Sequence, residues 1–95
     1  MINQLMKITK AEPRGDYRLY LLFSDGSEGE HDFADLIAKD GVMLVPLRDR
    51  GYFARVFLEE GALTWPNGLD LDPTALYRKM KALKQLRMPA AAALP

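Results

Sequence analysis

Few side chains in this sequence could do chemistry. His31 is the only histidine, and it lies between Glu30 and Asp32. A general base or a metal site would need partners that converge on His31 from elsewhere in the fold, and one histidine cannot form a two-histidine metal pattern. The chain has no cysteine, so it also lacks a thiolate ligand or nucleophile. We interpret His31 as an ordinary strand-surface histidine and expect no enzymatic activity, no cofactor and no metal.

An acidic run surrounds this histidine, with one base, Lys39, among its carboxylates. The acidic residues are Asp25, Glu28, Glu30, Asp32, Asp35 and Asp40. Their spacing lacks the alternating oxygens and the closing glutamate of a calcium loop, so we interpret them as solvated residues of a hairpin and a helix. In a strand, Glu28, Glu30 and Asp32 lie on one face, and their charge suits a basic protein surface.

A basic run follows near the C-terminus, and no acidic residue occurs after Asp72. Its members are Arg78, Lys79, Lys81, Lys84 and Arg87. Several such residues can bind phosphates, although exposed lysines are common on amphipathic helices and the run has no aromatic residues for base stacking. Contact between the basic run and the acidic strand of another copy would give a homo-oligomer.

The segment 63–77 contains the only tryptophan, Trp65, followed by Pro66, Asn67, Gly68 and Asp70. Polar side chains beside an aromatic ring could form a small ligand site. The structural interpretation is that Asn67–Gly68 forms a turn, Asp70 ties the loop by hydrogen bonds to the backbone, and Trp65 fills the core. We favour this interpretation because it explains the segment without a ligand.

Charge and composition narrow the class of protein. The 13 acidic residues balance the 13 basic ones, so no overall field draws the chain to nucleic acid or to an anionic membrane. The first residues lack the apolar core of a signal peptide, and no apolar run approaches the roughly 20 residues that span a bilayer. The absence of cysteine fits a reducing compartment. We expect a cytoplasmic protein without membrane contact.

The elements that position these residues can be predicted from periodicity. Alternation predicts strands over residues 4–12 and 28–33. The aromatic and aliphatic residues of 17–23 predict a second strand that is more deeply buried than the first. The loop 13–16 joins the first two strands, and Asp25–Gly26 predicts a tight turn between the next two.

The middle of the chain has weaker signals. A short helix should begin near Phe33, capped by Asp32, and end before Gly41. We expect residues 43–47 to form a buried, partly extended connector, and residues 49–54 to hold one helical turn.

The last third predicts a second hairpin, from strands over 55–59 and 62–65, and then a closing helix. Asp72 and Pro73 form a strong helix start, and we expect the helix to continue to about Leu86. Its docking stripe would comprise Leu76, Met80, Leu83 and Arg87. The prediction is one α+β domain over residues 1–88, with an antiparallel sheet, two hairpins, a short middle helix and a C-terminal helix packed on the sheet. Residues 89–95 are interpreted as a disordered Ala-rich tail.

Several motifs occur at a characteristic spacing. They are Phe23-Ser24-Asp25-Gly26, then Gly29 and Asp32, then Pro46-Leu47-Arg48-Asp49 with Phe53, and finally Trp65-Pro66-Asn67-Gly68, Asp70 and Pro73 with Leu76-Tyr77. Over roughly residues 6 to 78 this pattern resembles a bacterial family, the domain-of-unknown-function 2442 family. The resemblance implies a small α+β fold, like the N-terminal domain of longer proteins that add a helix-turn-helix module, and it implies no activity. Because this chain ends just after its helix, we expect no DNA function to carry over.

Some relatives resemble small proteins encoded beside another short partner, as in a toxin-antitoxin-like pair, which is an analogy and not a derivation from this chain. We expect a non-enzymatic protein-interaction module that is the regulatory member of such a pair. Its candidate surfaces are the basic helix and the acidic strand. The alternative is a nucleic-acid-binding accessory or transcription-associated protein that uses the basic C-terminal helix.

Overall fold

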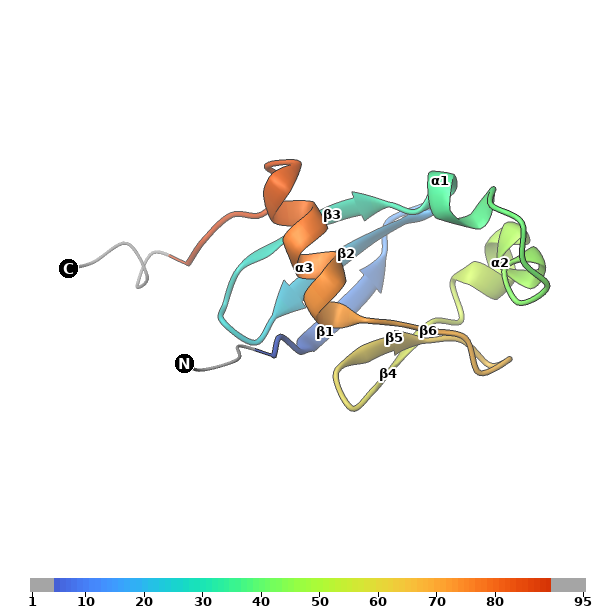
Figure 1. The fold of residues 1–95 in the computed structure, drawn as a ribbon, viewed down its shortest axis with the longest axis horizontal. Coiled ribbons are helices and arrows are strands. Elements are labelled where there is room, and N and C mark those ends of the chain that lie inside the picture. The colour runs from blue at the N-terminus through green and yellow to red at the C-terminus, as the bar shows by residue number, and fades with distance from the viewer. Residues whose placement is uncertain (1–4, 90–95) are drawn as a thin grey trace.

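The computed structural model describes residues 5–89 and confirms an α+β fold with two antiparallel sheets (Figure 1). The strand order is β1-β2-β3 in the first sheet and β4-β5-β6 in the second. In chain order the elements are β1 (Ile8–Pro13), β2 (Arg18–Phe23), β3 (Glu28–Asp32), α1 (Ala34–Ile37), the 3-10 helix η1 (Val45–Arg48), α2 (Arg50–Phe53), β4 (Phe57–Glu59), β5 (Ala62–Thr64), β6 (Asp70–Leu71) and α3 (Pro73–Ala82). No helix in this described part is long and apolar enough to cross a membrane.

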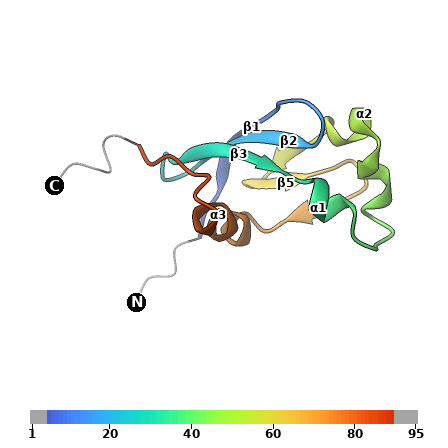
Figure 2. The same ribbon diagram turned by 90° about the horizontal axis from the view of Figure 1, so that it is seen from above.

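The first sheet has an apolar inner face and a polar outer face because side chains alternate along its strands. In β2, Leu19, Leu21 and Phe23 are buried, whereas Arg18 and Tyr20 lie on the opposite face. Figure 2 shows α3 beneath the sheet, where its apolar stripe covers the inner face. The outer face remains open to solvent.

The predicted hairpin between β2 and β3 is confirmed. Gly26 has a φ of 90°, a left-handed conformation that glycine adopts without steric cost. Its N–H donates to the Phe23 carbonyl at 2.9 Å, and the Phe23 N–H donates to the Ser27 carbonyl at 2.8 Å. The Asp25–Gly26 pair therefore fixes the register of β2 on β3.

Strand starts differ from the predictions by more than one residue in two places. The first strand begins at Ile8 and extends through Pro13, which an edge strand tolerates because a proline there removes no essential ladder bond. The strand predicted over 55–59 begins only at Phe57, since the Arg55 and Val56 amides still bond to the turn of α2.

The second sheet contains the predicted hairpin and one strand that we did not predict. Strands β4 and β5 pair through Phe57↔Thr64 and Leu58↔Leu63. Strand β6 adds to β5 through Leu63↔Leu71. A two-residue strand is too short to show a periodic pattern in the sequence. Strand β6 forms only because the turn at Trp65–Gly68 brings the chain back beside β5.

Aromatic rings fill the core between the sheets and the short helices. Phe33 and Phe53 have ring centroids 5.9 Å apart, and those of Phe53 and Trp65 are 5.7 Å apart. The Trp65 indole N–H donates to the Phe53 carbonyl at 2.9 Å, and Trp65 is 1% exposed. The predicted role of Trp65 in the core is confirmed.

Helix α3 begins as predicted but ends earlier. The Asp72 carboxylate accepts the Thr74 N–H at 2.9 Å, with Pro73 in the first turn. The helix stops at Ala82 because Lys84 adopts a left-handed φ of 60° and the Gln85 N–H bonds back to the Met80 carbonyl at 2.9 Å, which forms a Schellman stop. Leu76 and Met80 of the predicted docking stripe are buried, as expected, but Leu83 is 54% exposed and Arg87 is exposed. The predicted continuation of the stripe through Leu83 and Arg87 is therefore wrong.

The connector between α1 and α2 also differs from the prediction. Val45–Arg48 forms a 3-10 helix with Pro46 in its first turn, a position that suits the fixed φ of proline. Met43 and Val45 are 42% and 52% exposed, and only Leu47 is fully buried. A buried, extended connector over residues 43–47 was therefore the wrong prediction.

At the C-terminal end of the described residues, Pro89 is half-buried. A Cβ placed on Gly26 would lie 3.1 Å from the Pro89 ring, so this proline lies beside the β2–β3 turn. The rest of the predicted tail, residues 90–95, lies outside the described residues.

Candidate functional site

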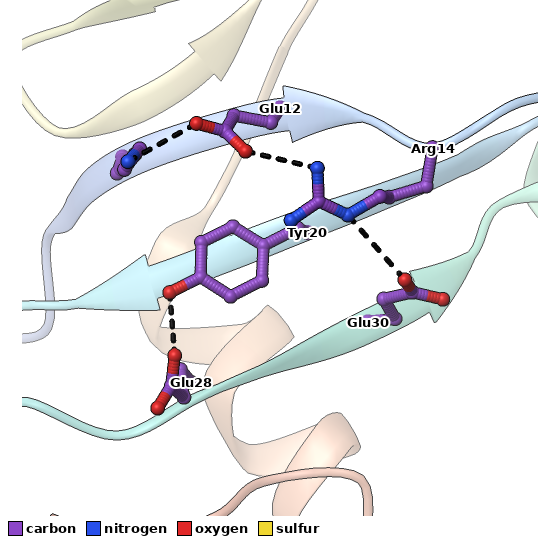
Figure 3. A network of polar contacts seen from close by, with 6 residues as sticks. Glu12, Arg14, Tyr20, Glu28 and Glu30 are labelled. Atoms are coloured by element: carbon purple, nitrogen blue, oxygen red, sulfur yellow. Dashed lines mark hydrogen bonds and ion pairs between the residues drawn. The ribbon is translucent and has the colours of Figure 1, made fainter.

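The outer face of the first sheet carries a connected set of charged residues, which we call the outer-face network (Figure 3). The register places Glu12 opposite Tyr20 and Tyr20 opposite Glu30. Arg14, just after β1, places its guanidinium 4.9 Å from the centre of the Tyr20 ring. The full set is Lys10, Glu12, Arg14, Tyr20, Glu28, Glu30 and Arg87.

Arg14 and Tyr20 are the two centres of the network. Arg14 pairs with Glu12 at 2.9 Å and with Glu30 at 3.5 Å. The Tyr20 hydroxyl donates to Glu28 Oε1 at 2.6 Å, and Glu28 Oε2 is paired with Arg87 at 3.2 Å. Residues from β1, β2, β3 and the segment after α3 thus meet on one face.

The network shifts the pKa values of three members. The Tyr20 hydroxyl, and then Arg87, lower the pKa of the Glu28 carboxyl, and the hydrogen bond to Glu28 raises the pKa of Tyr20. Hydrogen bonds from Lys10 and then Arg14 lower the pKa of Glu12. These shifts favour the neutral tyrosine and the ionised carboxylates. Tyr20 therefore keeps its proton near pH 7, and Glu12 and Glu28 do not take one up.

The network surrounds a shallow hollow of about 580 Å³ but has no excess charge, because three carboxylates face three cations. Glu28 and Glu30, which we predicted as part of an acidic docking surface, are both paired with arginines. The third residue of that prediction, Asp32, is exposed and accepts the Ala34 N–H at 2.9 Å. Within residues 5–89, no group of three or more acidic or histidine side chains could hold a metal ion.

The basic residues of α3 and of the helix stop that follows it at Lys84, which together we call the α3 surface, have a different environment. Arg78, Lys79, Lys81 and Lys84 are all exposed, and no ion pair within the described part of the chain involves them. The Lys81 ammonium lies 6.0 Å from the centre of the Tyr77 ring. All 13 acidic and eight of the 13 basic residues lie in residues 1–72, so the side chains carry −5 there and +5 beyond.

His31 is buried, contrary to our prediction of a strand-surface histidine. It is 7% exposed and pairs with Leu19 on the inner face. Its Nδ1 lies 2.7 Å from the Gln85 side-chain oxygen, and its ring meets Phe33 edge-on at 4.7 Å. Strand alternation contained this information, because a face that exposes Glu30 must turn His31 inward.

The turn at Asp25–Gly26 is tied to α3. Asp25 Oδ1 accepts the Ser27 N–H and hydroxyl at 2.9 and 2.6 Å, and Oδ2 accepts the Tyr77 hydroxyl at 2.8 Å. Partial burial acts to raise the pKa of Asp25, but these hydrogen bonds outweigh it and lower that pKa. Burial, and then the hydrogen bond to Asp25, raise the pKa of Tyr77.

The loop after Trp65 forms the predicted turn, but the residue that ties it is different. Gly68 has a φ of 90°, and its N–H donates to the Trp65 carbonyl at 2.9 Å. The Asn67 side chain accepts from the Leu69 N–H at 3.1 Å and donates to the Met43 carbonyl at 3.0 Å. The carboxylate of Asp70, which we expected to tie the loop, is exposed and makes no hydrogen bond within the described residues.

The interactions above involve several residues that sequence reasoning missed. They are Glu12, Arg14, Tyr20 and Gln85. Each contacts at least one residue of another element, so no local motif marks it. The period-two pattern of β1 and β2 was the only signal, because it places Glu12 and Tyr20 on the polar face.

Fold and sites together define a small α+β domain whose motif residues hold its turns and helix start in place. The chain belongs to the family described as "Protein of unknown function (DUF2442)", whose model matches residues 8–82. No curated protein and no solved structure matches this chain.

Proposed function

We propose that this chain is a non-enzymatic module that binds another protein, and that an acidic segment of the partner docks on α3. The observation that carries this proposal is the set of exposed cations Arg78, Lys79, Lys81 and Lys84, none of which is ion-paired within the described residues. The outer-face network, in contrast, neutralises its own charges. Helix α3 therefore supplies the uncompensated positive charge that steers an acidic partner.

An apolar side chain on the same surface favours a protein over a nucleic acid. Leu83 is 54% exposed and follows Lys79 by four residues, so the two share a side of the helix end. An apolar contact among cations adds affinity for a protein surface, whereas a phosphate backbone gains nothing from it.

The role as regulatory member of a toxin-antitoxin-like gene pair rests on the resemblance to paired small proteins, and the cytoplasmic location rests on the cysteine-free sequence.

The capture of a partner tests the proposal. Tagged protein is incubated with a nuclease-treated extract of the native host, and the bound proteins are identified and quantified. We expect one stoichiometric protein whose recovery falls as salt increases. Repeated failure to recover any such protein would rule the proposal out.

The second candidate function is that of a nucleic-acid-binding accessory, which the same four cations favour. In that case affinity for a 20-base-pair duplex should fall steeply between 50 and 200 mM salt. Reversing Lys81 and Lys84 to glutamate should abolish binding. If the duplex signal responds neither to salt nor to these changes, α3 does not bind nucleic acid.

A further inference from the structure

Strand β3 leaves part of its outer edge unpaired. The Ser27 carbonyl and the Phe33 N–H bond toward β2, so the alternation of an antiparallel ladder points the backbone groups of Glu28, Glu30 and Asp32 away from β2. Glu28 uses this edge in two bonds with Arg87, of 3.1 and 2.8 Å. No other segment within residues 5–89 bonds to the edge at Glu30 or Asp32.

A groove runs beside this open edge, between β3 and α1 on one side and α3 on the other. Two adjoining hollows of about 230 and 200 Å³ share His31, Leu36 and Lys79 as lining residues. Phe33 and Leu76 add to the apolar floor of the smaller hollow. Space of this size accommodates one or two side chains. If another strand paired with the open edge of β3, every second side chain of that strand would point toward the groove.

The rim of the groove is acidic. Asp32 and Asp35 line one hollow and Asp72 the other, with Lys79 as the only base in either lining. All three carboxylates are exposed and none is ion-paired within the described residues. A basic segment with apolar side chains is complementary to this rim and floor.

We infer that the open edge of β3 binds an extended segment of a partner protein by strand addition. The backbone of that segment pairs with Glu30 and Asp32, its apolar side chains enter the groove, and its lysines or arginines face the three carboxylates. The chain already uses the same edge for its own residue Arg87. The groove adjoins the α3 surface, since Lys79 lines both hollows and Leu83 lines one of them. It binds a basic segment whereas the cations of that surface bind an acidic one, so peptides of opposite charge test the two proposals independently.

The probe is an acetylated, amidated pentapeptide of alternating lysine and leucine, added to 15N-labelled protein. We expect saturable shifts of the Glu30 and Asp32 amides, and of Leu36 in the groove. A peptide with glutamate in place of lysine should bind at least tenfold more weakly. Shifts that concentrate on Lys81 and Lys84, or no binding at millimolar peptide, would overturn the inference.

Two matched pairs separate strand addition from a nonspecific charge effect. Ala75 is exposed and lines the smaller hollow, so Ala75→Leu should fill it and weaken the peptide at least tenfold. Ala82→Leu makes the same change at an exposed helix position outside both linings and should leave the affinity within twofold.

The second pair methylates the peptide nitrogens, either of the leucines or of the lysines. Only alternate residues of an added strand donate their backbone N–H to β3. One of the two methylated peptides should therefore lose at least tenfold more affinity than the other. Strand addition would be refuted if the two methylated peptides lost affinity equally, or if the Ala75→Leu and Ala82→Leu variants bound the peptide with equal affinity.

Discussion

Replacing Gly29 by alanine should detach the segment that follows α3. A Cβ on Gly29 would lie 2.0 Å from the carbonyl oxygen of Gln85, and contacts under 3.0 Å essentially never occur. The obstacle is backbone, so the segment must move by about 1 Å or more. The crossing of Gln85 over Gly29 is what allows Arg87 to reach the edge of β3.

The cost follows from the bonds that depend on this crossing. Glu28 and Arg87 exchange two backbone hydrogen bonds, and Gln85 makes a third with His31. At about 0.5–1.5 kcal/mol each, their loss amounts to roughly 1.5–4.5 kcal/mol. The lower unfolded-state entropy of alanine offsets about 0.4–1 kcal/mol of this. We therefore expect a decrease of about 0.5–4 kcal/mol in the free energy of unfolding.

Urea denaturation measures this change, and hydrogen exchange locates it. The Arg87 amide, which donates to the Glu28 carbonyl, should lose protection while the amides of β2 keep theirs. Gly51→Ala is the control, because its Cβ would meet no backbone and only the Asp49 side-chain oxygen, at 3.3 Å. That oxygen caps α2 through the Gly51 and Tyr52 N–H groups and must shift by only a few tenths of an ångström, so stability should stay within about 1 kcal/mol of wild type. A Gly29→Ala variant with wild-type stability and a protected Arg87 amide would refute the reasoning.

Three further predictions concern the core, acid stability and the helix end. Trp65→Ala should lower the free energy of unfolding by about 3–5 kcal/mol; if thermal unfolding barely changes while partner binding is lost, Trp65 belongs to a binding surface. The lowered pKa of Asp25 contributes stability above the unfolded-state pKa of about 4, and this is lost as the pH falls through the lower folded-state value. Tyr77→Phe removes one of the bonds responsible, so an NMR titration should show a higher pKa for Asp25 and acid unfolding should begin at a higher pH; no change in either would contradict the role of that bond. Lys84→Gly should stabilise the protein by about 0.5–1 kcal/mol in urea denaturation, since Lys84 holds a left-handed φ of 60° that glycine adopts freely; a loss of stability would count against this origin.

Local chemistry in the sequence was sufficient where a residue acts on its immediate neighbours. Asp72 and Pro73 predicted the start of α3, and Asp25–Gly26 predicted the hairpin, because caps and tight turns depend on side chains within a few positions. The aromatic and aliphatic residues of 17–23 likewise predicted a deeply buried strand, and β2 buries Leu19, Leu21 and Phe23.

The remaining features depend on contacts between distant segments. The residue with the left-handed φ at the end of α3 is Lys84 and not the usual glycine, so the sequence did not mark this helix end. The packing of Gln85 over Gly29 stabilises it. The outer-face network requires the registers of three strands together, so neither Arg14 nor Arg87 could be assigned a partner from the sequence. The burial of His31 was within reach, since the same alternation that exposed its acidic neighbours turned it inward.

The affinity of the captured partner for two charge variants tests most directly whether α3 binds an acidic protein. Lys81→Glu with Lys84→Glu reverses one cation of α3 and one just after its end, whereas Lys7→Glu with Lys39→Glu makes the same change in net charge at exposed lysines elsewhere. We expect a loss of roughly ten- to a hundredfold for the α3 variant and less than threefold for the control, with both variants folded by circular dichroism. Equal affinities for the two variants would contradict the proposed role of α3.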